Sequence, residues 1–197
     1  MNVLVVAALD EEVAHLPPGV GVAVTGVGKA RAAAGLSRWL ATSPHPDLVV
    51  NLGTAGAVRA GVHGVMEVGF VTQHDFAYDA VEQLLGEPAH RGFLLAGGRP
   101  PVAVHERPAE TLALATGDTF VADAAAAALI AAAGIHLVDM EGFGYAAACA
   151  EFGVPFRCVK AVSDSADDQA GATWLDTIDQ CARELGRWLE QHVVNRD

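Results

Sequence analysis

The sequence predicts an α/β fold, a single three-layer α/β/α sandwich with a central mixed, largely parallel sheet. Short apolar runs rich in valine alternate with segments that favour helix, which is the order typical of βαβ units. No internal repeat or linker-like stretch interrupts this alternation. The length of 197 residues suits one domain with a substantial core. We therefore expect residues 1–197 to form a single domain.

The predicted strands are the apolar runs that glycine, proline or polar residues bound. The third of them ends at Gly53, Thr54, Ala55 and Gly56, where we expect a turn. The last two each lead directly into a carboxylate, Glu141 in one case and Asp164 in the other. In order, the predicted strands cover residues 2–8, 20–25, 47–52, 67–72, 111–116, 134–140 and 156–163.

The predicted helices lie between these strands. A short helix or loop at 10–16 follows the first strand, and a glycine turn at 26–28 leads into the first long helix. Gly153 and Pro155 close another helix. Apolar residues at helical spacing, from Trp174 to Leu189, define the last helix. Glycine and proline pairs in residues 78–108 indicate loops and a hairpin. The helices cover residues 29–41, 122–133, 142–152 and the segment from 174 onwards.

Composition excludes several classes of partner. The formal net charge of −12 disfavours nucleic acid and anionic membrane surfaces. The cysteines, Cys149, Cys158 and Cys181, each lie in apolar sequence, so we expect reduced core residues. The eight histidines show no metal-binding spacing, and we expect neither a metal nor a cofactor. The start of the chain has no basic region followed by an apolar core, so the cytoplasm is the expected location.

Carboxylates placed directly after strands predict a polar small-molecule site. Glu141 and Asp164 fall at the carboxyl ends of predicted strands, where α/β sheets hold their ligands. A carboxylate there is costly to bury unless a ligand or donor pairs with it. Asp10, Glu11 and Glu12 follow the first strand. The macrodipole of a first helical turn accounts for two of these carboxylates, and a third is a candidate general base. Ser163 is best placed to hydrogen-bond its neighbour, since no nucleophile-elbow pattern surrounds it.

Two glycine-containing turns accompany these carboxylates. The strand-to-helix turn at residues 26–29 can hold an anion or a polar oxygen on its backbone N–H groups, or it is only a tight connection. The small residues at 53–56 let a ligand approach the backbone closely, or they form an ordinary turn. Both readings are open for each turn.

Six segments in one order resemble the signature segments of the purine nucleoside phosphorylase/nucleosidase superfamily. The resemblance is greatest to the methylthioadenosine/S-adenosylhomocysteine nucleosidases, and it covers nearly the whole chain. It implies a nucleoside phosphorylase-like fold and the hydrolysis of a purine ribonucleoside, with water as nucleophile. The segments are residues 5–13, 26–29, 51–56, 116–120, 139–142 and 162–164.

The resemblance also implies a role for each matching residue. Glu12 matches the general base that activates water, and Asp164 matches the acid that interacts with the purine N7. This suits the chemistry, because bond cleavage builds positive charge on the ribose and negative charge on the purine. The other matching residues form the substrate site. Glu141 matches the residue that binds the ribose hydroxyls, and Met140 packs beside the sugar. Ser163 orients the catalytic acid, Phe120 stacks on the purine and the backbone of Val121 meets its edge, while Thr54, Ala55 and Gly56 match the loop that lines the sugar side.

Three alternatives remain open from the sequence. A phosphorylase would need cations for phosphate, and related phosphorylases carry an arginine where this chain has Asn51. A futalosine hydrolase would act on a different purine and 5′ group. This alternative is open because residues 75–110, the region that shapes the 5′ pocket in the family, are short and altered. A non-catalytic nucleoside-binding module would need no water-activating base. The family also implies a homodimer.

Overall fold

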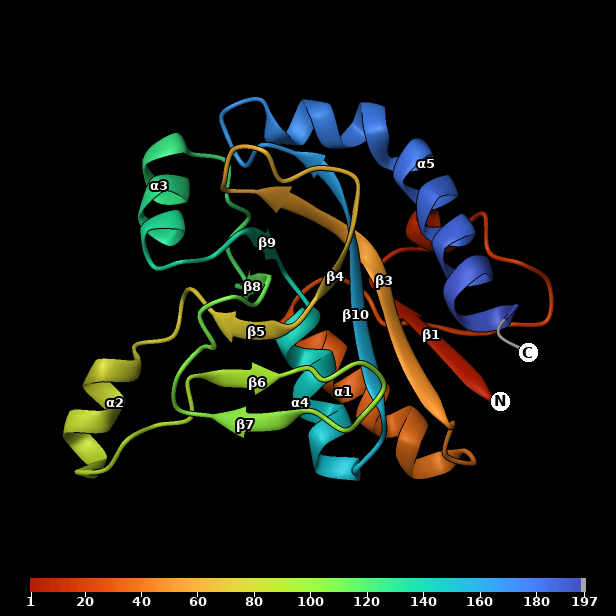
Figure 1. Cartoon of the computed structure of the whole chain (residues 1–197), viewed down its shortest axis with the longest axis horizontal. Helices are drawn as coiled ribbons and strands as arrows, with labels where there is room; N and C mark the ends of the chain where they lie inside the picture. The colour runs from red at the N-terminus through yellow and green to blue at the C-terminus, as the bar shows by residue number, and fades with distance from the viewer. Residues whose placement is uncertain (196–197) are drawn as a thin grey trace.

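The computed structural model describes residues 1–195 and confirms the predicted α/β class. Figure 1 shows one strongly twisted sheet, with helix α5 along one side and helices α1 and α4 together on another. The helices are η1 (Asp10–Val13, 3₁₀), α1 (Lys29–Thr42), α2 (Tyr78–Leu85), α3 (Ala124–Ala132), α4 (Gly142–Phe152), α5 (Ala170–Leu189) and the π-helical turn η2 (Glu190–Val194).

Ten strands form one mixed sheet in which parallel pairs dominate the centre. The main path runs β2-β1-β3-β9-β8-β5-β6-β7, and β10 pairs with β3 and β4 beside that path. The strands are β1 (Val3–Ala7), β2 (Gly21–Val24), β3 (Leu48–Ala57), β4 (Val65–Val68), β5 (Phe70–Gln73), β6 (Gly92–Leu94), β7 (Val102–Val104), β8 (Ala113–Thr116), β9 (Leu137–Asp139) and β10 (Phe156–Asp164).

Alternating apolar residues of the central strands pack into cores on both faces of the sheet. Leu4 and Val6 of β1 face the core shared with α1 and α4. Val5, between them, faces the core shared with α5, where Leu185 lies fully buried. The two cores make the predicted three layers. No helix within residues 1–195 is long and apolar enough to cross a membrane.

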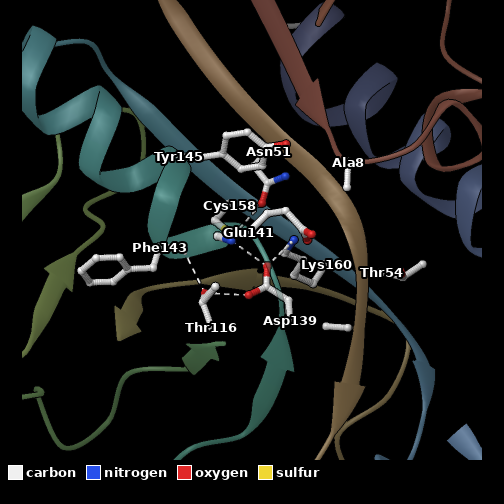
Figure 2. A network of polar contacts seen from close by, with 12 residues as sticks. Ala8, Asn51, Thr54, Thr116, Asp139, Glu141, Phe143, Tyr145, Cys158 and Lys160 are labelled. Atoms are coloured by element: carbon white, nitrogen blue, oxygen red, sulfur yellow. Dashed lines mark hydrogen bonds and ion pairs between the residues drawn. The ribbon is translucent and has the colours of Figure 1, made fainter. Parts of the chain in front are cut away.

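A gap along one edge of β3 positions the site. β10 occupies the other edge over residues 49–56. β1 pairs in parallel with the start of β3, whereas β9 pairs antiparallel with its end. Because these two strands run in opposite directions along the same edge, their carboxyl ends point toward each other, as Figure 2 shows around Ala8 and Asp139. The stretch of β3 between them lacks a neighbouring strand and faces a cavity.

The expected turn at residues 53–56 is wrong, because β3 continues through it to Ala57. Partner strand β10 pairs with this stretch from Lys160 opposite Gly53 to Asp164 opposite Gly56, with a shift of register between Val162 and Asp164. The glycines instead provide space. A Cβ atom on Gly53 would lie 3.0 Å from Lys160 Nζ, and one on Gly56 would lie 2.9 Å from Asp164 Oδ1.

Two further expectations need correction. The predicted strand at 67–72 is two strands, β4 and β5, separated by Gly69, whose missing side chain leaves room for Thr111. Residues 78–85 form helix α2 rather than a loop. None of its residues is buried, so the helix does not require the row of buried apolar residues by which a helix is recognised in a sequence. The predicted hairpin is confirmed as the antiparallel pair β6–β7.

Candidate active site

One cavity of about 250 Å³ contains every residue that the sequence singles out for substrate or catalysis. It opens at the gap beside β3, between the ends of β1, β9 and β10. The predicted residues on its wall are Glu12, Thr54, Ala55, Gly56, Phe120, Val121, Met140, Glu141, Ser163 and Asp164. Residues from five separate parts of the chain therefore converge, while their individual roles stay predictions.

Glu12 is held by four hydrogen-bond donors. The 3₁₀ turn η1 directs its carboxylate back toward the sheet, where it is 5% exposed. Its Oε2 accepts from the backbone N–H groups of Ala8 and Leu9, at 3.1 and 3.2 Å. Its Oε1 accepts from Thr54 N at 2.8 Å and Thr54 Oγ1 at 3.0 Å. The missing strand beside β3 frees the Thr54 N–H for this bond. These donors fix the position of the carboxylate.

Glu141 enters the cavity from the end of β9 and the start of α4. It is 7% exposed, and its Oε1 accepts from Gly28 N at 2.9 Å. Burial and the nearby charge of Asp139 raise the pKa of Glu141 to about 7, although Lys160 acts in the opposite direction. The residue is thus poised to accept or release a proton near neutral pH.

Asp164 lies at the carboxyl end of β10, on the far side of the cavity from the glycine turn. Its Oδ2 accepts from Ser163 Oγ at 2.7 Å, as predicted for a pair of neighbours. Its Oδ1 accepts from Ala166 N at 2.8 Å. Ala166 adopts a left-handed conformation with φ 51°, which is uncommon outside glycine and turns the chain back toward the carboxylate.

Apolar residues complete the wall of the cavity. Phe120 stands at the entrance and is 49% exposed, whereas Val121 beside it is buried. Val27 and Leu9 line the wall near the glycine turn and the end of β1. A flat aromatic face at the entrance and an apolar lining suit a planar heterocycle with a small apolar substituent.

The glycine turn before α1 uses its N–H groups on the protein's own carboxylates. Gly28 N binds Glu141, and Lys29 N binds Asp118 Oδ1 at 2.9 Å. The Lys29 ammonium forms an ion pair with Asp75. One of the two interpretations of the sequence was that this turn binds a polar oxygen. It does so here, and the oxygen atoms belong to the side chains of Glu141 and Asp118.

Sequence reasoning did not single out three residues of this region for function. Trp174 of α5 was assigned only to the helix core, yet it lines the cavity and its Nε1 donates to Thr54 Oγ1 at 3.0 Å. Asp139 lines the cavity floor, where Lys160 Nζ lies 2.8 Å from its Oδ2. The signal for Lys160 was present, since a lysine in the middle of an apolar strand needs a buried partner.

Comparisons with known proteins agree with this geometry. The family model described as "Phosphorylase superfamily" matches residues 18–193. A 5′-methylthioadenosine/S-adenosylhomocysteine nucleosidase from Exiguobacterium sp. is 31% identical over 172 residues, covering 79% of this chain and 71% of the relative.

Two solved structures from Helicobacter pylori show the same fold. A variant of the methylthioadenosine nucleosidase with 5′-methylthioadenosine in its active site superposes with TM-score 0.81 at 18% identity, covering 98% of each chain. A futalosine hydrolase gives TM-score 0.77 at 18% identity, covering 98% of this chain and 97% of the other.

Proposed function

This chain belongs to the phosphorylase superfamily, and we propose that it hydrolyses the N-glycosidic bond of a purine ribonucleoside. The candidate substrates are 5′-methylthioadenosine, S-adenosylhomocysteine and related 5′-modified nucleosides. The observation that carries the proposal is the convergence of Glu12, Glu141 and Asp164 on one cavity. The similarity to the Exiguobacterium nucleosidase supports the same reaction.

Each carboxylate supplies one part of the chemistry. Glu12, fixed by its four donors, accepts a proton from the attacking water. Ionised Glu141 accepts hydrogen bonds from the ribose hydroxyls, and its charge favours the cation-like sugar of the transition state. Asp164, oriented by Ser163, donates a proton to the purine N7 as the base leaves.

Water rather than phosphate is the proposed nucleophile, because the site is rich in negative charge. The carboxylates around the cavity repel a phosphate dianion. The N–H groups of the glycine turn already bind Glu141 and Asp118. Asn51, where the related phosphorylases carry an arginine, donates to Val6 O at 3.1 Å inside the sheet. The described cavity wall contains no lysine or arginine, and the two N–H groups of the glycine turn are already engaged.

The proposed substrate carries an adenine-type base and a 5′ thioether group next to the ribose. Leu9, Val27 and Trp174 give the wall an apolar surface that suits an alkylthio group. The futalosine hydrolase of the same fold makes a futalosine the second substrate to test.

Product analysis tests this proposal directly. Methylthioadenosine, adenosylhomocysteine, 5′-deoxyadenosine, adenosine, inosine and futalosine would be incubated with the protein, with and without phosphate. We expect free base and free sugar at equal rates in both conditions. A sugar 1-phosphate formed only with phosphate would make the protein a phosphorylase and would remove Glu12 from its role.

A substitution separates catalysis from binding alone. Glu12→Gln should lower turnover by about 10²–10⁴-fold, because it removes the base, while nucleoside binding measured by calorimetry should survive. The exposed neighbour substitution Glu11→Gln is the matched control and should leave turnover unchanged. A Glu12→Gln protein with full activity would contradict the mechanism, and binding without any turnover in the unmodified protein would favour the binding module.

We also propose a homodimer in the cytoplasm. The exposed faces of Val27 and Phe120 at the cavity entrance support a second copy that closes it. The buried, unpaired cysteines are those expected in a reducing compartment. Light scattering at the mass of one 20.3 kDa chain would contradict the dimer, and fractionation of cells would test the location.

A further inference from the structure

A buried ion pair lies beneath the cavity, between β9 and β10. Lys160 Nζ and Asp139 Oδ2 are 2.8 Å apart, and each side chain is 1% exposed. Figure 2 shows this pair below Glu141, with Thr116 on its other side. Burying two charges costs more than their attraction returns unless further hydrogen bonds satisfy them. A pair at this depth therefore depends on the further hydrogen bonds around it.

Asp139 has three donors, and together with Thr116 they fix the beginning of α4. Its Oδ2 accepts from Gly142 N at 2.8 Å as well as from Lys160. Its Oδ1 accepts from Thr116 Oγ1 at 2.6 Å. The same Thr116 oxygen accepts from Phe143 N at 2.9 Å. Asp139 and Thr116 thus take up the first two N–H groups of the helix, which have no partner inside it.

We call Asp139, Thr116 and Lys160, with their bonds to the start of α4, the clamp. Glu141 lies inside it, two residues after Asp139 and one before Gly142. Glycine at 142 is what allows the clamp to close, because a Cβ atom there would lie 2.7 Å from Leu114 Cδ2 and 3.0 Å from Asp139 Oδ2. The direction of the Glu141 side chain into the cavity is therefore set by contacts that Glu141 itself does not make.

The charges of the pair act on Glu141 in opposite senses. Asp139 on β9 raises the pKa of Glu141, and Lys160 on β10 lowers it. Glu12 on η1 adds a smaller upward effect, and Tyr145 of α4 is the other titratable group beside it. Burial lowers the pKa of Lys160, but Asp139 outweighs that effect and holds it above its ordinary value. The lysine therefore remains a cation among three carboxylates.

We propose that Asp139 is a positioning residue, which holds Lys160 and the first turn of α4 so that the Glu141 side chain points into the cavity toward the sugar. The inference rests on the proposed hydrolase function. Asp139 acts through Glu141 and needs no contact with the substrate. Thr116 and Lys160 are its partners, one for geometry and one for charge.

Four variants test this assignment. Asp139→Asn keeps the shape but removes the negative charge, and Lys160→Met removes the positive one. The double variant removes both charges and leaves no unpaired buried charge. It can therefore still be measured if a single variant does not fold. Cys158→Ala is the matched control, since Cys158 is equally buried on β10 but its hydrogen bond goes to Asn51.

The first measurement needs no turnover. The ¹³C carboxyl signal of Glu141, assigned by its loss in Glu141→Gln, would be followed against pH. We expect Asp139→Asn to lower the midpoint and Lys160→Met to raise it, each by roughly one pH unit. The double variant should return toward the unmodified protein, and Cys158→Ala should leave the midpoint in place. Midpoints that stay fixed in both single variants, or move in the same direction, would overturn the proposal.

The second measurement is the pH profile of kcat/KM for base release. We expect Asp139→Asn to lower kcat/KM by roughly 100-fold, the effect of a displaced catalytic group, with its acidic limb at lower pH. Lys160→Arg, which keeps the charge, should retain most of the activity. An Asp139→Asn protein with unchanged kcat/KM would refute the positioning role. If the midpoints move as expected but the protein cleaves no nucleoside, the proposed function is refuted. The inference that Asp139 positions Glu141 would still stand.

Discussion

Replacing Glu141 with glutamine should make the protein more stable and less active at the same time. Glu141 is 7% exposed, and burial together with Asp139 raises its pKa from 4.5 to about 7. Each factor of ten in an ionisation constant corresponds to about 1.4 kcal/mol. Keeping Glu141 ionised in the folded protein therefore costs on the order of 3 kcal/mol. Glutamine has the same shape and still offers an oxygen to Gly28 N.

The pH dependence identifies the cause of this cost. Between pH 4.5 and 7 the unfolded chain has released the Glu141 proton and the folded protein has kept it, so stability falls as pH rises through this window. At pH 8 we expect Glu141→Gln to raise the free energy of unfolding by about 3 kcal/mol. Below pH 4.5 the side chain is neutral in both states, and the variant should match the unmodified protein.

Guanidinium denaturation at pH 4 and pH 8 measures this difference. Glu151→Gln is the control, because Glu151 lies exposed near the end of the same helix, and it should show no gain at either pH. Base release by Glu141→Gln should fall by about 10²-fold or more, as a lost charge-assisted contact to the sugar predicts. Equal stability of Glu141→Gln and the unmodified protein at pH 8 would refute the reasoning.

Three other predictions concern the cavity wall and the chain as a whole. Gly53→Ala places a carbon 3.0 Å from Lys160 Nζ and 3.1 Å from Glu12 Oε1, so kcat should fall about tenfold or more. Gly21→Ala is the control, because its Cβ atom meets nothing closer than 3.4 Å and Gly21 lies outside the cavity wall; equal rates for the two would contradict the crowding argument. Trp174→Phe should abolish the change in tryptophan fluorescence on nucleoside binding, since Trp174 is the one tryptophan on the described cavity wall; a signal that persists would place the ligand elsewhere. Calorimetry should show a single unfolding transition for residues 1–197, and two resolved transitions would divide the predicted domain.

The central strands and the carboxylates could be predicted because their signals are local. An apolar run followed by an acidic residue and a helix marks Glu141 and Asp164 without any knowledge of the sheet, and both side chains line the cavity. The helix at 142–152 was predicted at its observed bounds, because Gly153 and Pro155 end it in the sequence itself.

The remainder depends on partners that are far away in the sequence. Gly53 and Gly56 look like turn residues, yet they lie in β3 because β10 pairs with them and needs their missing side chains. The apposed ends of β1 and β9 depend on strand direction, which no single segment contains. Asp139 likewise acquires its meaning only when Lys160 arrives from the next strand.

The gap beside β3 has a consequence for the order in which the molecule folds. Glu12 bonds a residue 42 positions away, and Glu141 bonds Gly28 across 113 positions. Contacts of such long range form late, since the loops between them must close first. During synthesis β10 emerges after every other strand of the sheet, so a nascent chain has no complete cavity until then. The proposed nucleoside ligand therefore binds and stabilises only those molecules in which the cavity is complete. Ligand binding then indicates that folding is complete.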